Sequence, residues 1–297
     1  LAFGLGTRRL RRLTDAVQGF SRSDFNDEIS DLRRSGSGDE IDQLDSAFRA
    51  MAVRIREQVD RLQENDRLRR ELVSNVSHDL RTPLASMQGY LETLLIKNGE
   101  LSPAERERCL QVARRNTERL GVLVDDLFEL SKLDAASVTP NFETFSLAEL
   151  MQDTSQEFEL DAHRKNIDLE VEATQDSAIV YADIGLIQRV LENLLRNAIQ
   201  YTPERGRIRI TVEKRFAGVA VAVSDSGCGI AESDLPRIFD RFYRQERGGV
   251  NPSGSAGLGL AIVKRILDLH DSRITVTSEI DRGTRFEFNL RSEPLAA

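Results

Sequence analysis

The sequence predicts a multidomain protein in which an all-α N-terminal part precedes a two-layer α/β sandwich. Three observations support this fold class. A chain of 297 residues exceeds the usual size of one domain. Apolar residues recur every three or four positions up to about residue 134, as in amphipathic helices. Beyond that point helical segments interrupt antiparallel strands, which favours a sheet with helices on one face.

The first helical unit contains two apolar stripes separated by a polar connector at residues 21–39. The stripes are formed by Leu10, Leu13, Val17 and Phe20, and by Ile41, Leu44, Phe48, Met51 and Ile55. Neither helix can bury its stripe alone, so the simplest solution is a parallel four-helix bundle in a homodimer. A solvated coiled-coil spacer fits the same spacing.

The N-terminal end is apolar for six residues and then basic at Arg8, Arg9, Arg11 and Arg12. Such a pattern is left where a transmembrane helix exits on the cytoplasmic side, where positive charge accumulates. We therefore interpret residues 1–6 as the end of a membrane span, which places this fragment on the cytoplasmic side of the plasma membrane. An ordinary amphipathic helix start is the alternative.

A helical hairpin follows. Its first arm continues from Ile41 to Thr82 without Gly or Pro, and Pro83 is expected to bend it. A turn at 97–99 ends this arm, and a capping box from Ser102 to Glu105 opens the next. The apolar stripe of the second arm is wide, which predicts burial in a four-helix bundle formed by dimerisation.

The C-terminal part begins with a capping box from Ser146 to Glu149. The pattern predicts helices at 147–163, 184–200, 234–243 and 257–269, strands at 167–172, 178–182, 207–215 and 218–224, and a final hairpin.

Composition excludes several classes of function. A net charge of -8 argues against nucleic acid as a partner, because binding phosphates needs a basic surface. Two cysteines, Cys109 and Cys228, suggest neither a disulfide framework nor a zinc site.

The strongest motif is the run Ser77-His78-Asp79-Leu80-Arg81-Thr82-Pro83-Leu84. A neutral imidazole attacks a γ-phosphate through one nitrogen if a carboxylate takes the proton on the other. The run resembles the phosphoacceptor box of histidine kinases, with His78 as nucleophile and Asp79 as general base. The same resemblance implies that Thr82, one helical turn away, orients water when the kinase dephosphorylates its partner. A surface histidine with chance neighbours is the alternative.

Two asparagines stand one turn apart on the predicted helix at 184–200. Amide oxygens suit magnesium, which bridges nucleotide phosphates. The segment resembles the N box of the same family, with Asn197 as the Mg2+ ligand and Asn193 supporting it. Tyr201 belongs to the same expected ATP site, whereas Gln200 stands where relatives often carry Lys or Arg.

Two glycine-rich segments complete the resemblance. In the first, Asp225 is expected to accept from the adenine amine, while Gly227 and Gly229 let the backbone approach the base. Alone, this could be just a tight turn.

The second glycine-rich segment precedes a helix, so its free backbone donors would face the phosphates of ATP. Its expected binding residues are Gly257, Leu258, Gly259 and Leu260.

The run from Phe239 to Arg244 resembles the F box. Arg241 and Arg244 are expected to bind the transferring phosphoryl group, and residues 245–256 to form a mobile lid. Solvated helix charges are the alternative for both arginines.

Residues 7–60 resemble the HAMP signal-relay module at 39–41 and 48–51. The resemblance thus divides the chain into the membrane end (1–6), HAMP (7–60), the dimerisation and phosphoacceptor domain (61–136) and the catalytic ATP-binding domain (137–297).

The resemblance implies a homodimeric sensor histidine kinase of a two-component system. It would phosphorylate His78 with ATP, transfer the phosphoryl group to an aspartate of a response regulator, and act as the regulator's phosphatase. A dimeric scaffold that binds nucleotide without catalysis is one alternative. A stand-alone ATPase of the topoisomerase or chaperone kind is another, although these lack a histidine-bearing hairpin.

Overall fold

The computed structural model describes residues 11, 14–15, 18, 40–97, 99–134, 138–173, 179–215, 218–244 and 257–292. Two compact units are present, Leu1–Ser74 and Asn75–Ala297. The stub at 1–6, the four apolar residues of the first stripe, the connector at 21–39 and the lid at 245–256 lie outside the described residues.

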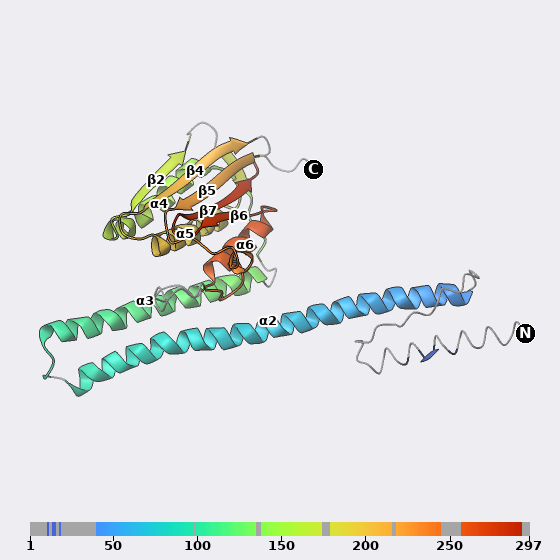
Figure 1. Cartoon of the computed structure of the whole chain (residues 1–297), viewed down its shortest axis with the longest axis horizontal. Helices are drawn as coiled ribbons and strands as arrows, with labels where there is room; N and C mark the ends of the chain where they lie inside the picture. Colours follow the sequence, from blue (N-terminus) through green and yellow to red (C-terminus); the bar gives the residue numbers. More distant parts are fainter. Residues whose placement is uncertain are drawn as a thin grey trace, which may run out of the picture. The chain divides into compact units, whose positions relative to one another are not determined.

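The second predicted stripe lies on α2 (Glu40–Ile96), the long helix of Figure 1. Phe48 is buried, whereas Leu44 and Met51 are each more than half exposed within the single chain. Among the described helices, none is both long enough and apolar enough to cross a membrane.

The predicted hairpin is confirmed: α2 is followed by α3 (Pro103–Asp134). The Ser102 capping box is formed, with the Glu105 amide donating to Ser102 Oγ and the Ser102 amide donating to Glu105 Oε2. Gly99 in the connecting turn has φ +99°, which suits glycine. Asn116 of α3 donates to Ser86 of α2 at 3.2 Å, so the two arms pack side by side. α2 continues through Pro83 without interruption, and the bend expected there stays a prediction.

The five-stranded sheet has the order β2-β4-β5-β7-β6 (Figure 1). Its strands are β2 (Asp168–Ala173), β4 (Arg207–Arg215), β5 (Gly218–Asp225), β6 (Thr275–Glu279) and β7 (Gly283–Leu290). We expected antiparallel strands only, but β2 and β4 run parallel. The strand predicted near 178–182, β3 (Ile179–Ala182), pairs instead with β1 (Glu143–Ser146) in a separate two-stranded sheet.

Three helices form the second layer of the sandwich: α4 (Leu147–Arg164), α5 (Ile184–Tyr201) and α6 (Gly259–Leu269). Ser146 caps α4 and Asp183 caps α5, each accepting a backbone N–H with its side-chain oxygen. The helix predicted at 234–243 is wrong, because only the 3-10 turn η1 (Leu235–Arg237) forms there. Phe242 adopts φ +62°, which is incompatible with a continuing right-handed helix.

The C-terminal half of α3 shares a hydrophobic core with this sandwich. Leu123, Leu130 and Leu133 are 3%, 1% and 1% exposed and belong to the same buried cluster as residues of α5 and α6. Leu80 of α2 packs against that cluster as well. The end of the hairpin and the sandwich are therefore one packed body.

Candidate active site

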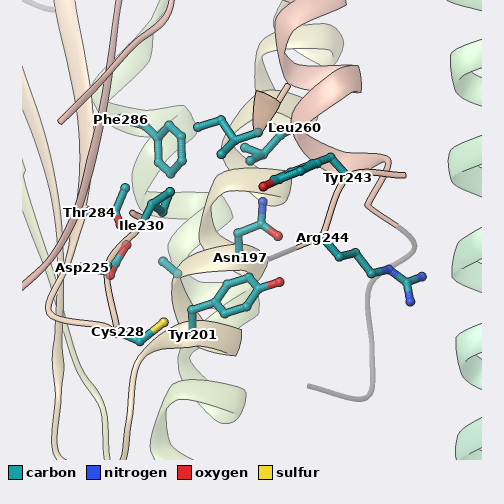
Figure 2. Close-up of a pocket in the computed structure, with 13 residues that line it drawn as sticks. Asn197, Tyr201, Asp225, Cys228, Ile230, Tyr243, Arg244, Leu260, Thr284 and Phe286 are labelled. Atoms are coloured by element: carbon teal, nitrogen blue, oxygen red, sulfur yellow. The ribbon is translucent and has the colours of Figure 1, made fainter. Parts of the chain in front are cut away.

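An open pocket lies at one end of the sandwich, between α5, α6, β7 and the loop after β5 (Figure 2). Polar and apolar side chains share its lining. The lining residues are Asn197, Ala198, Tyr201, Asp225, Cys228, Gly229, Ile230, Ile238, Tyr243, Arg244, Leu260, Thr284 and Phe286. Its mixed character suits a ligand with one flat apolar part and one charged part.

Asp225, the last residue of β5, is the acid in this lining. The Gly227 amide donates to its Oδ1 at 2.8 Å. Burial raises the pKa of Asp225 above its ordinary value, while hydrogen bonds from the backbone of Gly227 and Thr284 lower it in part. A half-buried carboxylate held in this way is an acceptor for one more N–H group from a ligand.

Two glycines allow the chain to come close beside Asp225. Gly229 has φ +66°, and a Cβ there would lie 2.0 Å from the carbonyl oxygen of Glu279. Gly283 has φ +109°, and a Cβ there would lie 1.8 Å from the carbonyl oxygen of Asp225. Any side chain would therefore displace the strand ends that form this side of the pocket.

The two asparagines of α5 have different environments. Asn197 lines the pocket together with Tyr201, as Figure 2 shows. Asn193 is 3% exposed and donates to the Arg189 carbonyl, while its Oδ1 lies under the backbone of Gly259. The structure therefore brings Asn197 to the pocket and places Asn193 beneath the start of α6.

The second glycine-rich segment leads into α6. Gly257 has φ +71°, and Leu258 is fully buried. No side chain caps the first turn of α6, which begins at Gly259, and Leu260 lines the pocket. Leu258, the N-cap residue, offers the backbone N–H groups of this turn no side-chain acceptor, and a helix start of this kind favours an anion.

His78 lies on α2 with its side chain 81% exposed. Its Nδ1 is 3.4 Å from Asp79 Oδ1, and the hydroxyl of Thr82 donates to the His78 carbonyl at 3.2 Å. Asp79 is more enclosed, at 16% exposed, and its other oxygen accepts from Arg244 at 2.5 Å. Arg244 therefore connects the pocket to the carboxylate beside His78.

Arg241 does not line the pocket. Its guanidinium pairs with Asp134 at the end of α3 at 2.8 Å. Of the two arginines expected to bind phosphate, the structure brings only Arg244 to the pocket.

Sequence reasoning missed the apolar wall of the pocket, including Ile238, Tyr243 and Phe286. The available signal was the alternation on β7, where Thr284 and Phe286 stand two residues apart and therefore face the same side. The described residues contain no group of three or more His, Cys, Asp or Glu that could hold a metal ion. Asn197, which the sequence predicts as a metal ligand, lies in the pocket lining.

Two protein families match the chain. Residues 182–294 match the histidine kinase-, DNA gyrase B- and HSP90-like ATPase family. Residues 68–136 match the His Kinase A phosphoacceptor domain.

Among solved structures, the histidine kinase AdeS of Acinetobacter baumannii aligns with a TM-score of 0.59 and 27% identity, covering 73% of this chain and 98% of that one. The histidine kinase ThkA in complex with the response regulator protein TrrA aligns with a TM-score of 0.56 and 25% identity, covering 81% of this chain and 67% of that one.

Curated relatives give the same result. Drug sensory protein A of Synechocystis is 33% identical over 260 residues, covering 84% of this chain but only 39% of the relative. The sensor histidine kinase YclK of Bacillus subtilis is 28% identical over 292 residues, covering 98% of this chain and 59% of the relative. The sensor-like histidine kinase SenX3 of Mycobacterium bovis is 31% identical over 303 residues, covering 96% of this chain and 72% of the relative. With this coverage and both domain matches, the chain belongs to the sensor histidine kinase family.

Proposed function

We propose that this chain transfers the γ-phosphoryl group of ATP to His78. The observation that carries the proposal is the contact of pocket-lining Arg244 with Asp79, whose other oxygen faces His78 Nδ1. If Asp79 accepts the Nδ1 proton, the lone pair of the neutral imidazole is on Nε2. The exposed ring leaves that nitrogen accessible to a phosphoryl group, with Asp79 as the general base.

The pocket residues divide between the two ends of ATP. Asp225 accepts from the adenine amine, and Gly227 and Gly229 keep that end of the pocket free of side chains. Gly257 and Leu258, together with Gly259 and Leu260 of the first turn of α6, donate backbone N–H groups to the phosphates. Tyr201 lines the side of the pocket formed by α5.

The amide oxygen of Asn197 is a hard donor of the kind that Mg2+ binds, and water and nucleotide oxygens would complete its shell. Mg2+ neutralises charge on the phosphate oxygens when it is bound. Asn193 acts indirectly, since it supports the backbone of Gly259 at the start of α6.

The phosphoryl group then passes from His78 to an aspartate of a response regulator. The complex of ThkA with TrrA supports this class of partner. We assign the reverse activity, dephosphorylation of the regulator, to Thr82, one turn after His78. In that reaction the Thr82 hydroxyl leaves the His78 carbonyl and orients a water molecule.

A homodimer is proposed because the hairpin exposes large apolar side chains. Leu95 of α2 is 77% exposed and Phe128 of α3 is 65% exposed. A second copy would cover such residues in a four-helix bundle.

We further assign residues 7–60 as the HAMP relay and place the chain at the cytoplasmic side of the plasma membrane, attached through its N-terminal segment. Unchanged kinase and phosphatase activities in Phe48→Asp would contradict the relay role.

The test is incubation with Mg2+ and ATP labelled in the γ-phosphate. Wild type should gain acid-labile, base-stable label, and both His78→Gln and Asn197→Ala should lose it. Retained binding of nucleotide by His78→Gln shows that the variant is folded. Label that persists in His78→Gln would refute the acceptor. Nucleotide binding by wild type without any label would favour a non-catalytic scaffold.

A further inference from the structure

We propose that the ATP pocket serves His78 of its own chain, so that phosphorylation occurs within one subunit of the dimer. This inference rests on the proposed kinase function and adds to it the identity of the acceptor histidine. A domain match alone leaves this choice open, because either subunit of a dimer could present the acceptor.

The first step is the attachment of the catalytic sandwich to its own α3. Leu130 and Leu133 are each 1% exposed within the core that α5 and α6 share. Arg189 of α5 pairs with Asp126 and Glu129 of α3, at 3.1 Å and 2.6 Å. Apolar burial and these ion pairs together fix the sandwich on this helix.

The second step concerns the last turn of α3. Arg265 of α6 donates to the Leu133 carbonyl at 3.2 Å, and Arg241 pairs with Asp134 at 2.8 Å. Only residues 135–137 lie between Asp134 and Val138, which packs against the shared core. A connection of this length keeps the sandwich next to the hairpin arm from which it emerges.

The third step is the level of this attachment along the hairpin. Asn116 of α3 is hydrogen-bonded to Ser86 of α2, and the arms run in opposite directions. His78 is eight residues before Ser86, and Val124 is eight residues after Asn116. Because helices rise equally per residue, these two positions share one level. Leu123 of the shared core and Asp126, the partner of Arg189, lie one and two residues from this level, so that part of the attachment is beside the chain's own His78.

The fourth step is the direct contact. Leu80, two residues after His78, packs against the shared core, and Arg244 from the pocket pairs with Asp79 of the same chain. The pocket and the histidine are thus joined through side chains of one subunit. The bond between the γ-phosphorus and the β–γ bridging oxygen breaks, a bond from phosphorus to His78 Nε2 forms, the Nδ1 proton moves toward Asp79, and ADP leaves.

Arg244 is accordingly a positioning residue in this arrangement. It holds the carboxylate that takes the imidazole proton, and it does so from the wall of the nucleotide pocket. A second subunit's histidine would need its own Asp79 to reach the same guanidinium.

The experiment uses two pairs of full chains, and the two chains of each pair are co-expressed with different tags. Purification through both tags retains only mixed dimers, which are then incubated with γ-labelled ATP. The first pair joins His78→Gln, which keeps its pocket, with Asn197→Ala, which keeps its histidine. The second pair joins wild type with the double variant His78→Gln and Asn197→Ala. Nucleotide binding by the His78→Gln chain confirms that the pocket is intact.

Transfer within one subunit predicts no label above background in the first pair and acid-labile label on the wild-type chain in the second. Transfer between subunits predicts the reverse, with label on the Asn197→Ala chain of the first pair and none in the second. That result would overturn this inference and leave the kinase function standing. Absence of label from the wild-type homodimer would overturn both.

Discussion

Asp126 of α3 and Arg189 of α5 are joined by an ion pair of 3.1 Å, although 63 positions of sequence separate them. Glu129 and Glu192 approach the same guanidinium at 2.6 Å and 3.0 Å. Three carboxylates thus surround one arginine whose side chain is 24% exposed. Asp126 is the most enclosed of the three, and burial, opposed by Arg189 and Arg196, raises its pKa to about 6.

Replacement of Arg189 by Met should strongly destabilise the protein. The substitution would leave the largely buried carboxylates of Asp126 and Glu129 without their cation. Removal of one partner from a buried ion pair typically lowers the unfolding free energy by about 3 kcal/mol. Urea denaturation measures the change in unfolding free energy. Arg164→Met is the matched control, because its pair with Asp161 is exposed and should contribute less than about 1 kcal/mol. Equal losses in both variants would contradict a special role for Arg189.

The raised pKa of Asp126 predicts a pH dependence of stability. Between its ordinary value of 3.8 and about 6, the folded state binds more protons than the unfolded state. The stabilising contribution is complete below pH 3.8 and is lost as pH rises through 6. The unfolding free energy of wild type should therefore fall by about 2 to 3 kcal/mol relative to that of Asp126→Asn between about pH 4 and about pH 7. Unfolding free energies of both proteins at several pH values provide the measurement, and parallel curves would show that Asp126 is not the group responsible.

Substitution of Gly229 by Ala should deform the pocket. The residue has φ +66°, and the new Cβ would lie 2.0 Å from a backbone oxygen that cannot rotate away. Nucleotide affinity, measured by calorimetry, should fall about tenfold or more, which corresponds to at least about 1.4 kcal/mol.

Gly185→Ala provides the comparison for Gly229→Ala, because its added Cβ meets its nearest atom at 3.6 Å, an ordinary contact. Its nucleotide affinity should stay unchanged. A loss of the same size in both variants would mean that glycine content, and not the close approach at Gly229, controls binding.

Asp225→Asn should weaken the recognition of adenine. The amide oxygen can still accept from Gly227, but the new NH2 group competes with the donor that the adenine amine would supply. We expect a loss of about 1 to 3 kcal/mol in ATP binding and less discrimination between ATP and GTP in competition experiments. Asp268→Asn, an exposed position on α6 outside the pocket lining, should bind ATP like wild type. Unchanged base preference in Asp225→Asn would remove the assigned role.

The sequence predicted what depends on neighbouring residues. The hairpin turn, the caps at Ser102 and Ser146, and the helix carrying Asn197 follow from local patterns, and the structure confirms these elements. The helix predicted at 234–243 does not form, because the backbone is left-handed at Phe242. The spacing of apolar residues did not reveal this.

Features that depend on distant residues were not predictable in this way. Periodicity assigns β2 to the sheet but does not reveal its parallel pairing with β4. The position of Asn193 beneath α6 depends on the close approach of Gly259, which belongs to another helix. Likewise, the partners of Arg241 and Arg244 lie on the hairpin, 107 and 165 positions away in the sequence. The residues next to each arginine therefore could not identify its partner.

The backbone contacts around Asp225 have a consequence for the thermodynamics of nucleotide recognition. Its carboxylate is already fixed by the Gly227 amide, and Gly283 allows β7 to lie directly against the end of β5. Little conformational freedom remains there for a ligand to remove, so the base-recognition end is preorganised. The entropy needed to order these groups is lost on folding and not on binding. The unfavourable entropy of binding ATP should therefore come from the phosphate end, and adenosine should bind with a smaller entropic loss than ATP.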